Sequence, residues 1–466
     1  MIDGGDVEDG CTVVLDIGKT NAKLTLWDRA GRCLARHVRE NEIIEGAGYR
    51  ALDAAGIEAW MAPVLADFAR IAHVRAIVPV GHGAAAALVA GGRLFAPPMD
   101  YEDEGGEEER AAYLARRDAF EATGSPALPV GLNLGFQLHR LETLTGPWPD
   151  DLAILPWPQY WAWRFSGVTA SEVTSLGCHS DLWRPWDGAP SALAQDAGWA
   201  RRLPPLRRAG AVLGPVTAEW TALGLSADCQ VLCGLHDSNA ALLAARGHAE
   251  IAAEDATVLS TGTWFVALRS TGEQAAERTA LDPRRDCLVN VDAFGRPTLS
   301  ARFMGGREAE VICQAADIGP QAADLESARL VLEAGAALYP TFAPGVGPFP
   351  EDVGRWDRRP DDERQRRAAM ELYLALMASE ALDLIGSRGR LLVEGRFAEH
   401  EVFVRALAAL RGGQKVYVSN AHDDVPYGAL RLIAPDLPPP SPLVAVAPLP
   451  FALDSYARAW RAGLCV

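Results

Sequence analysis

The stretch VVLDIGKTNAKLTLW, residues 13–27, contains Gly18-Lys19-Thr20, the tripeptide that ends a P-loop. A P-loop needs glycines ahead of its lysine, so that backbone N–H groups can surround phosphate oxygens. Here the preceding residues are the apolar run Val13–Leu15, then Asp16 and Ile17, which is the pattern of a strand that leads straight into a turn. The stretch therefore predicts a β-hairpin with a polar tip and argues against a P-loop.

The residues that follow extend this hairpin into an α/β pattern. Ala22–Trp27 alternates apolar and polar side chains, which is typical of a half-buried strand, and Arg32–Val38 alternates again after a turn. Ile57–Ile71 is helical in pattern, and the apolar run that ends at Val80 is typical of a buried strand. Because helices and strands continue to alternate, we expect an α/β fold.

The opening pattern returns near the middle of the chain. Thr257–Leu268 is again a strand, a small polar turn with a glycine, and a strand. Gly18 and Gly262 lie about half a chain length apart. A repeat of this length predicts two similar domains that each begin with a hairpin. Two unrelated hairpins are the alternative that the repeat alone leaves open.

Length and composition limit the kind of protein. The chain has 466 residues, 49% of them hydrophobic, and a net charge of −17, so we expect two domains and neither nucleic acid nor a membrane as partner. No apolar run approaches the roughly 18 residues of a membrane-spanning helix. The acidic N-terminus, residues 1–10, is unlike a signal peptide, and the eight cysteines lack C-x-x-C spacing. These features predict a cytoplasmic protein with reduced thiols.

The polar tips suit phosphate binding. Backbone N–H groups in such turns can form nests for phosphate oxygens, and hydroxyls and a lysine add donors and charge. Asp16, just before the first tip, suits a Mg²⁺ ion held through water. A plain surface turn is an equally good interpretation of this tip.

Asp237 follows a second buried strand, which ends at Gly234, and precedes a helix of small residues. As a helix cap, its carboxylate would accept hydrogen bonds from backbone N–H groups. As a general base, it would orient a hydroxyl group and take its proton during phosphoryl transfer. Spacing alone leaves both interpretations open.

Five sets of segments, spread over nearly the whole chain, together resemble the FGGY carbohydrate kinases of the actin, sugar kinase and Hsp70 superfamily. Residues 16–23 and 260–263 resemble the first and second phosphate motifs, and residues 234–240 resemble the segment of the catalytic aspartate. Residues 81–83 with 98–102 resemble the sugar-contacting loops, and residues 158–167 with 172–175 resemble the stretch lining the sugar side.

The resemblance implies two actin-like, ribonuclease H-like domains with mixed sheets flanked by helices and an active-site cleft between them. Residues 1–245 would bind the sugar and supply the base, and residues 246–466 would bind the nucleotide, with the last helix returning to the first domain. The implied activity is ATP-dependent phosphorylation of a sugar hydroxyl with Mg²⁺. A homodimer is the default assembly.

The resemblance also implies site residues. Asp237 would be the catalytic base, and Asp16 would hold Mg²⁺ through water. The residues that would contact the sugar are His82, Asp100, Gln137 and His236. The residues that would contact the nucleotide are Gly18, Lys19, Thr20, Asn21, Lys23, Ser260, Thr261, Gly262, Thr263 and Gly395. Lys19 departs from the family's small residue at this position, so it would either contact a phosphate or reach solvent.

Within the family, three segments are similar to the rhamnulokinase and fuculokinase branch, whose substrates are 6-deoxy ketoses phosphorylated at the primary 1-hydroxyl. These segments are residues 133–138, 234–237 and 260–264. The sequence does not name the sugar. The family's adenosine motif begins with paired glycines after a strand; here only Gly395 remains in register, and Glu394 and Arg396 bring a charge pair. A catalytically reduced sugar or nucleotide sensor is therefore one alternative, and an actin-like scaffold or ATPase is another.

Overall fold

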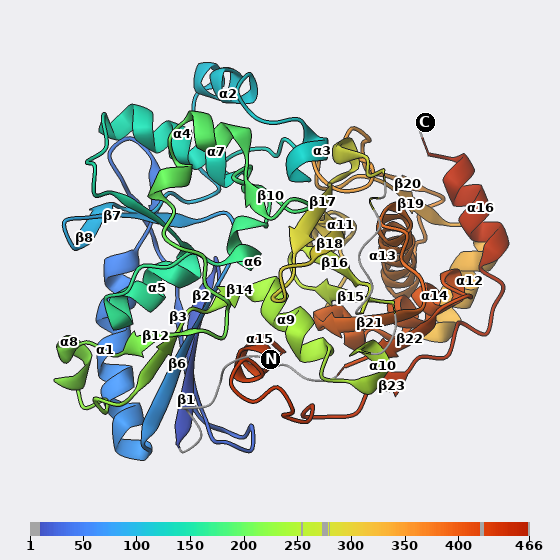
Figure 1. The fold of residues 1–466 in the computed structure, drawn as a ribbon. Helices are drawn as coiled ribbons and strands as arrows, with labels where there is room; N and C mark the ends of the chain where they lie inside the picture. Colours follow the sequence, from blue (N-terminus) through green and yellow to red (C-terminus); the bar gives the residue numbers. More distant parts are fainter. Residues whose placement is uncertain (1–9, 253–254, 273–277, 279, 420–423, 465–466) are drawn as a thin grey trace. The chain divides into compact units, whose positions relative to one another are not determined.

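The computed structural model describes residues 10–252, 255–272, 278, 280–419 and 424–464 (Figure 1). The chain divides into two compact units. The first contains the described residues within Met1–Gly247, Val289–Pro297 and Asp423–Pro438, and the second those within His248–Leu288, Thr298–His422 and Pro439–Val466. Each is built around a seven-stranded mixed sheet, so the predicted α/β class is confirmed.

The sheet of the first unit has the strand order β12–β13–β6–β1–β2–β3, and β14 also pairs with β6. Strands β1, β2 and β3 form the predicted antiparallel meander, whereas β6 and β13 continue the sheet in parallel and β12 closes it antiparallel. The strands are β1 (Cys11–Ile17), β2 (Asn21–Trp27), β3 (Cys33–Glu40), β6 (Val74–Gly81), β12 (Val212–Pro215), β13 (Gln230–Leu232) and β14 (Leu235–His236).

The second sheet repeats this arrangement in the order β18–β16–β15–β21–β22–β23, with β17 added outside β18. The pairings are again antiparallel, antiparallel, parallel, parallel and antiparallel. The predicted repeat is therefore confirmed, with β15 in the place of β1. The strands are β15 (Ala256–Thr261), β16 (Phe265–Ser270), β17 (Cys287–Val291), β18 (Pro297–Phe303), β21 (Arg390–Gly395), β22 (Lys415–Val418) and β23 (Val444–Ala445).

Smaller sheets and the helices complete the units. The smaller sheets are β4 (Ile43–Glu45) with β5 (Arg50–Leu52), β7 (Ala86–Ala90) with β8 (Arg93–Ala96) and β9 (Ala153–Pro156), β10 (Trp183–Arg184) with β11 (Ala189–Pro190), and β19 (Ala337–Tyr339) with β20 (Arg355–Asp357). The helices of the first unit are α1 (Ala54–Ile71), α2 (Glu107–Leu114), α3 (Phe120–Thr123), α4 (Leu134–Thr145), α5 (Trp157–Ser166), α6 (Val173–Leu176), α7 (Ala192–Asp196), η1 (Ala200–Arg202), α8 (Ala218–Thr221), α9 (Asp237–Ala245) and α15 (Asp424–Leu430). Those of the second are α10 (Ala249–Ala252), η2 (Pro283–Arg285), α11 (Gly305–Ala316), α12 (Leu325–Ala334), α13 (Glu363–Leu384), η3 (Arg396–Glu399), α14 (Glu401–Leu410) and α16 (Asp454–Ala462).

Strand β1 lies in the middle of its sheet, which explains why it is apolar on both faces. Val13, Leu15 and Ile17 pack into a core with side chains of α1 and α5, whereas Val14 packs on the opposite face with those of α9 and α15. Because side chains alternate along a strand, Asp16 lies on the same face as Val14. The sequence of β1 thus places one carboxylate on the α9 face, at the carboxyl end of the central strand.

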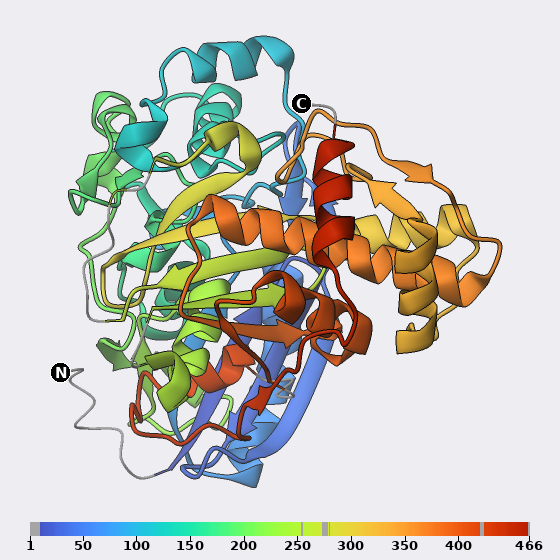
Figure 2. The ribbon, with the colours of Figure 1, turned by 90° about the vertical axis from the view of Figure 1, so that its right-hand side faces the viewer.

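The chain returns to the first unit through residues 423–438, which include α15. The sequence analysis predicted that the last helix would return to the first domain, whereas in the structure residues that include α15 do so and α16 belongs to the second unit. In the second unit, α16 packs on β19, where Tyr456 donates to the carbonyl oxygen of Ala336 at 2.8 Å and the indole of Trp460 to that of Leu338 at 2.7 Å. Figure 2 shows α16 in dark red against the long orange helix α13, to which the Arg461–Glu380 ion pair joins it. Buried aromatic anchors therefore fix the last helix to its own unit.

Two whole-chain expectations can be compared with the described residues. The seven cysteines among them are all free thiols, and Cys465 lies outside them, as does most of the acidic N-terminal segment. Among the described helices, none is both long enough and apolar enough to cross a membrane.

Helix α15 lies so close to α9 that only glycine fits at position 428. A Cβ atom there would come 1.8 Å from the carbonyl oxygen of Ala240. Gly428→Ala should therefore lower the free energy of unfolding by roughly 1–3 kcal/mol, the usual effect of overpacking. A urea titration measures this change. Gly413→Ala is the control, because a Cβ at position 413 would meet nothing within 4 Å. Equal stability of the two variants would contradict this close packing.

Candidate functional site

The carboxyl ends of three neighbouring strands meet at one edge of the first sheet. Strand β6 pairs in parallel with β1, where Gly81 faces Ile17, and with β14, where Gly81 faces His236. His82 follows β6, and its backbone N–H donates to the carbonyl oxygen of Ile17 at 3.1 Å. In open α/β sheets ligands bind outside the carboxyl ends of the strands. The pairing thus collects Asp16, His82, His236 and Asp237 at such an edge.

Gly18-Lys19-Thr20 forms the tip of the β1–β2 hairpin, as the sequence predicts. The N–H of Gly18 donates to the carbonyl oxygen of Asn21 at 3.0 Å and closes the turn. Asn41 supports the tip from outside, because its side-chain amide donates to the carbonyl oxygen of Gly18 at 2.9 Å and its N–H to that of Thr20 at 2.7 Å. The tip is thus held in one conformation by backbone contacts.

Asp16 is a buried carboxylate beside two charges of opposite sign. Burial, together with the negative charge of Asp237, raises its pKa to about 6, although Lys23 acts in the opposite direction. Lys23 is the cross-strand neighbour of Asp16 and places its Nζ 3.4 Å from Oδ2. A cation between Asp16 and Asp237 would relieve their repulsion.

Asp237 is the first residue of α9. Its Oδ1 accepts hydrogen bonds from the N–H of Ser238 and from the Ser238 hydroxyl at 3.2 Å, and it lies 3.2 Å from Nε2 of His236. The N-terminus of a helix favours a negative charge. The bond to Ser238 is local and leaves Oδ2 available, so the carboxylate is oriented without being consumed as an N-cap, a position that His236 occupies.

His236 lies between Asp237 and a buried thiol. Its Nε2 is 3.5 Å from Sγ of Cys178. Although burial alone lowers the pKa of His236, the charges of Cys178 and Asp237 raise it to about 9. His236 is therefore a cation beside the Asp237 carboxylate at neutral pH. Sequence analysis did not identify Cys178, which is 58 residues from His236 in the chain, and neither motif nor spacing singles it out.

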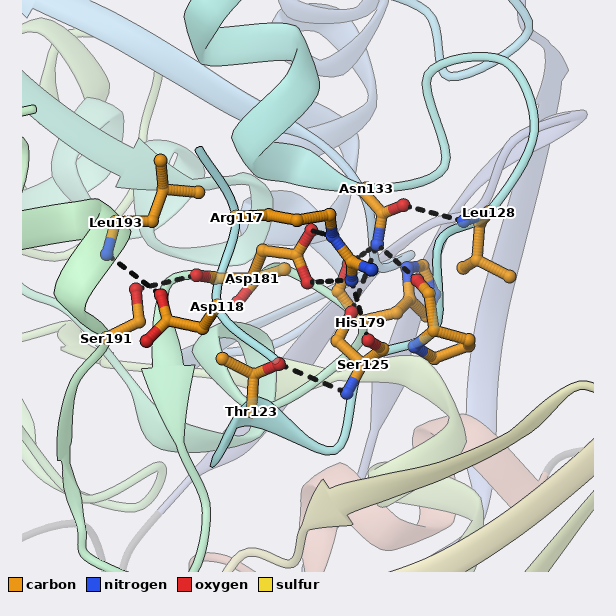
Figure 3. Close-up of polar contacts among 12 residues, drawn as sticks. Arg117, Asp118, Thr123, Ser125, Leu128, Asn133, His179, Asp181, Ser191 and Leu193 are labelled. Atoms are coloured by element: carbon orange, nitrogen blue, oxygen red, sulfur yellow. Dashed lines mark hydrogen bonds and ion pairs between the residues drawn. The ribbon is translucent and has the colours of Figure 1, made fainter. Parts of the chain in front are cut away.

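The segment that carries Cys178 is pinned by a buried polar network (Figure 3). Arg117 donates two hydrogen bonds to Asp181, with Nε 3.0 Å from Oδ2 and Nη2 2.7 Å from Oδ1. The side-chain amide of Asn133 donates to the carbonyl oxygen of His179 at 3.2 Å. His179 and Asp181 both have positive φ angles, 37° and 61°, a conformation that costs non-glycine residues about 1–3 kcal/mol. The network holds this conformation and thereby fixes Cys178 against His236.

Two of the predicted sugar-contacting residues, His82 and Gln137, differ in whether their polar atoms already have hydrogen-bond partners. His82 donates from Nδ1 to the carbonyl oxygen of Gly83 at 2.6 Å, since a carbonyl can only accept, and its Nε2 has no hydrogen-bond partner among the described residues. Burial lowers its pKa, so Nε2 is a free acceptor. Gln137, by contrast, donates from Nε2 to the carbonyl oxygens of Ala84 and Gly131, each at 2.6 Å. Its amide nitrogen braces two loops.

Lys19 contacts the loop of Asp100. Its Nζ forms an ion pair with Oδ1 of Asp100, lies 3.6 Å from Glu102 and sits 4.9 Å from the ring centroid of Tyr101. Arg50 approaches the other oxygen of Asp100 at 3.4 Å. The sequence left phosphate or solvent as partners of Lys19. In the structure its ammonium group pairs with the fully buried carboxylate of Asp100, and its side chain stays 17% exposed. Lys19 and Asp100 are 81 positions apart in the chain, so sequence analysis could not identify this pair.

In the second unit, the tip between β15 and β16 is closed by the N–H of Gly262, which donates to the carbonyl oxygen of Trp264 at 3.0 Å. The N-terminus of α11 lies against this tip, since the N–H of Gly306 donates to the carbonyl oxygen of Thr263 at 3.2 Å and a Cβ on Gly306 would come 2.1 Å from that of Gly262. Helix N-termini are ready anion sites. The glycines that start α11 were missed by sequence analysis, although a glycine pair before an amphipathic helix could have indicated them.

Glu394 and Gly395 end β21 beside the same tip. Gly395 has a φ of 84°, and a Cβ there would come 2.5 Å from the carbonyl oxygen of Thr261, so only glycine fits. The buried Glu394 accepts a hydrogen bond from the hydroxyl of Ser260, and its own carbonyl oxygen accepts one from Thr261 at 2.6 Å. Arg396 begins η3 and places its guanidinium 4.9 Å from the centroid of the Phe397 ring.

The residues present fit Mg²⁺ only as a hydrated ion. Within the described chain, no group of three or more His, Cys, Asp or Glu side chains is arranged to hold a metal. Mg²⁺ commonly keeps several waters and binds through one or two carboxylates together with phosphates. The neighbouring carboxylates Asp16 and Asp237 match that mode.

Comparisons with known proteins agree with this architecture. A family model described as "Carbohydrate kinase FGGY, C-terminal domain" matches residues 253–440. The chain is 50% identical to a carbohydrate kinase from Novosphingobium aromaticivorans, whose structure aligns over 98% of both chains with a TM-score of 0.91. No curated protein sequence matches the chain significantly.

More distant structures show the same fold. A ligand-bound xylulose kinase from Lactobacillus acidophilus is 15% identical over 97% of this chain and 96% of its own, with a TM-score of 0.79. Plasmodium falciparum glycerol kinase with ADP is 14% identical over 97% and 92%, with a TM-score of 0.75. The predicted two-domain, actin-like fold is confirmed by these matches.

The charges around Asp16 predict opposite effects of two substitutions on its pKa. Asp237→Asn should lower the pKa below about 6, because it removes a neighbouring negative charge. Lys23→Gln should raise it, because it removes a positive charge. NMR titration of ¹³C-labelled aspartate carboxyl groups measures both shifts, and Asp150→Asn, at an exposed aspartate, is the control. Shifts of the same sign in both variants would contradict this arrangement.

Proposed function

Because the chain belongs to the FGGY carbohydrate kinase family, we propose that it transfers the terminal phosphoryl group of ATP to a sugar hydroxyl, with the sugar on the first unit and the nucleotide on the second. The proposed acceptor is a ketose, in particular a 6-deoxy ketose of the rhamnulose or fuculose type, phosphorylated at its primary 1-hydroxyl. A cytoplasmic location and a homodimer are further predictions.

The observation that carries the proposal is the meeting of Asp16, His82 and Asp237 at one sheet edge. Phosphoryl transfer needs a carboxylate that orients the attacking hydroxyl and accepts its proton. Asp237 suits this role because the backbone and hydroxyl of Ser238 fix one of its oxygens. His236, with Nε2 3.2 Å from Oδ1, helps to orient this carboxylate.

The sugar contacts follow from the free and occupied groups on this edge. Nε2 of His82 accepts a hydrogen bond from a sugar hydroxyl, since the described residues give it no other partner. The Lys19–Asp100 pair lies on the neighbouring loop, and we assign both residues to the sugar side. Gln137 acts by bracing the loops at Ala84 and Gly131. A site with so few unpaired donors can distinguish sugars sharply by their hydroxyl groups.

The phosphates of ATP bind to the two hairpin tips, residues 18–21 and 260–263, with Lys23 near the first. Support comes from the backbone N–H groups at the start of α11, which lie against the second tip. Gly395 lets the backbone of β21 approach Thr261 of this tip closely. Mg²⁺, held by Asp16 through water, would neutralise charge on the transferring phosphoryl group. The rest of the chemistry belongs to the side chains named above.

The deoxy-ketose assignment rests on segments similar to the rhamnulokinase and fuculokinase branch. One of them begins with Asn133, which is buried and donates from its amide to Ser125, Pro126 and His179. This residue positions the loop that carries His179 and Cys178 and does not itself select a sugar. The other two segments contain His236 with Asp237 and Trp264 after the second tip.

A second candidate function is a sugar or nucleotide sensor with little turnover. Glu394 favours it, because its buried carboxylate accepts a hydrogen bond from Ser260 at the tip where phosphates would bind. A negative charge there opposes a nucleotide phosphate unless a cation compensates it. The two functions differ in whether bound ATP is consumed.

Removal of the base tests the proposed reaction. Asp237→Asn should lower sugar-dependent ADP release at least about a thousandfold, since general base catalysis typically contributes 10²–10⁴-fold and the variant also loses a charge near the metal. The assay measures ADP release with ATP and Mg²⁺ over a panel of ketoses, 6-deoxy ketoses, aldoses and polyols. Asp150→Asn makes the same chemical change on the surface and should retain wild-type activity.

Each outcome of this panel decides between the candidates. A signal with 6-deoxy ketoses that Asp237→Asn loses supports the kinase proposal and its substrate class. ADP release with a different sugar would support the kinase reaction but refute the deoxy-ketose assignment. Silence over the whole panel, with ATP binding measured by calorimetry, favours the sensor.

The Lys19–Asp100 ion pair predicts which substrate Lys19 affects. Lys19→Ala should raise KM for the sugar about tenfold, equivalent to roughly 1.4 kcal/mol, and leave KM for ATP nearly unchanged, because its ammonium group is directed to the sugar-side loop. Steady-state kinetics with each substrate varied in turn measures both constants. Lys415→Ala, at an exposed lysine of the second unit, is the control. A rise in KM for ATP alone would return Lys19 to the phosphates.

A further inference from the structure

The first unit contains a cavity of about 890 Å³, within the usual range for small-molecule sites of about 300–1,000 Å³. Its apolar lining includes Trp183, Leu243, Phe294 and Leu432. Phe294 is half exposed, although large apolar side chains are usually covered. Glu172 and Val173 in this lining belong to the stretch 172–175, which the resemblance places on the sugar side. None of the individual side chains that we assign to sugar, nucleotide or Mg²⁺ lines the cavity, so their proposed contacts do not account for it.

Glu172 lines this cavity and is incompletely satisfied. Its side chain is buried, with 0% exposure. Oε2 accepts hydrogen bonds from the hydroxyl and N–H of Thr174, whereas Oε1 has no partner among the described residues. A buried polar atom without a partner costs about 1–3 kcal/mol, and more if charged. Burial raises the pKa of Glu172 to about 7, which agrees with this lack. A ligand hydroxyl or amine could donate to Oε1.

Two adjacent arginines, Arg207 and Arg208, also line the cavity. In the described part of the chain, the guanidinium of Arg207 forms no ion pair and donates only to the carbonyl oxygen of Leu206, at 3.2 Å. Arg246 and Arg296 stack on Phe294, 5.2 and 4.9 Å from its ring centroid. Arg296 is already paired with Asp292 at 2.7 Å. In a chain with a net charge of −17, the two guanidinium groups of the lining, Arg207 and Arg208, favour an anionic ligand.

We propose that this cavity is a binding site for an apolar organic acid that carries a hydroxyl or amine group. The apolar body would lie between Trp183, Leu243 and Phe294. The acid group would pair with Arg207 and Arg208, and the hydroxyl or amine would donate to Oε1 of Glu172. Each part of the proposed ligand is thus matched to one group of residues in the cavity.

A short chain of hydrogen bonds links this site to the residue before the proposed base. The hydroxyl of Thr174 donates to Oε2 of Glu172 and accepts from the N–H of His236 at 3.0 Å. A ligand that engages Glu172 therefore acts on the bond that holds the backbone of His236. We infer that occupancy changes KM for the sugar, and this link alone rests on the proposed kinase function.

The probe for the site is 8-anilinonaphthalene-1-sulfonate, which combines apolar rings, an anionic group and an N–H donor, and which fluoresces in apolar surroundings. Titration of the full chain should show saturable binding at one site per chain. Ala293→Trp fills the cavity, which Ala293 lines, and Arg207→Glu reverses a charge at it. Each should weaken binding at least tenfold. Arg201→Glu makes the same charge change at an exposed arginine outside the lining and should bind like the wild type.

Circular dichroism and melting temperatures establish that the variants are folded. Equal affinity of folded Ala293→Trp, Arg207→Glu and wild type would overturn the site, as would the absence of saturable binding. The link is tested by KM for the sugar with saturating probe, which should shift at least twofold in the wild type and not in Thr174→Val. Binding without that shift would overturn the link alone. Loss of phosphorylation over the whole sugar panel would refute the kinase proposal and leave the fluorescence result standing.

Discussion

The parallel pairing of β6 with β1 on one side and β14 on the other is the constraint on which the candidate site depends. Gly81 is in register with both Ile17 and His236, so three strand ends stop at one level. A slip by one residue would turn Asp16 to the face covered by α1 and α5. The apolar side chains of Val13, Leu15 and Ile17, which must stay buried on the α1 face, specify this register. The side chains at the strand ends are therefore free to be chosen for chemistry.

Local patterns in the sequence were enough to predict the elements and the repeat, because strand alternation and turn residues act over a few positions. The hairpin at residues 13–27 and its copy at Thr257–Leu268 show this. The contacts that define the site could not be predicted from the sequence, because they join segments that are far apart in the chain. Lys19 meets Asp100, and Cys178 meets His236. The direction of the Lys19 side chain depends on where the loop of Asp100 lies, which no local pattern encodes.

Opposite charges offset one another in the candidate site of the first unit. Asp16, Asp100 and Asp237 concentrate negative charge on the first unit, where Lys19, Lys23, Arg50 and a cationic His236 offset it. Glu394 adds a buried carboxylate at the tip of the second. On the proposed kinase function, a nucleotide would bring further negative charge, which a divalent cation would neutralise.

The return of the chain through α15 has a consequence for synthesis of the protein. Tyr427, Ala429 and Leu430 belong to the core on the α9 face of the first sheet, together with Val14 and Trp27. Domains made of one continuous segment can fold as they leave the ribosome, the N-terminal one first. Here the first unit cannot complete its fold until α15 has been synthesised, which happens after most of the second unit has been made. Until then only part of this apolar face is covered, by α9, and the rest stays exposed during translation.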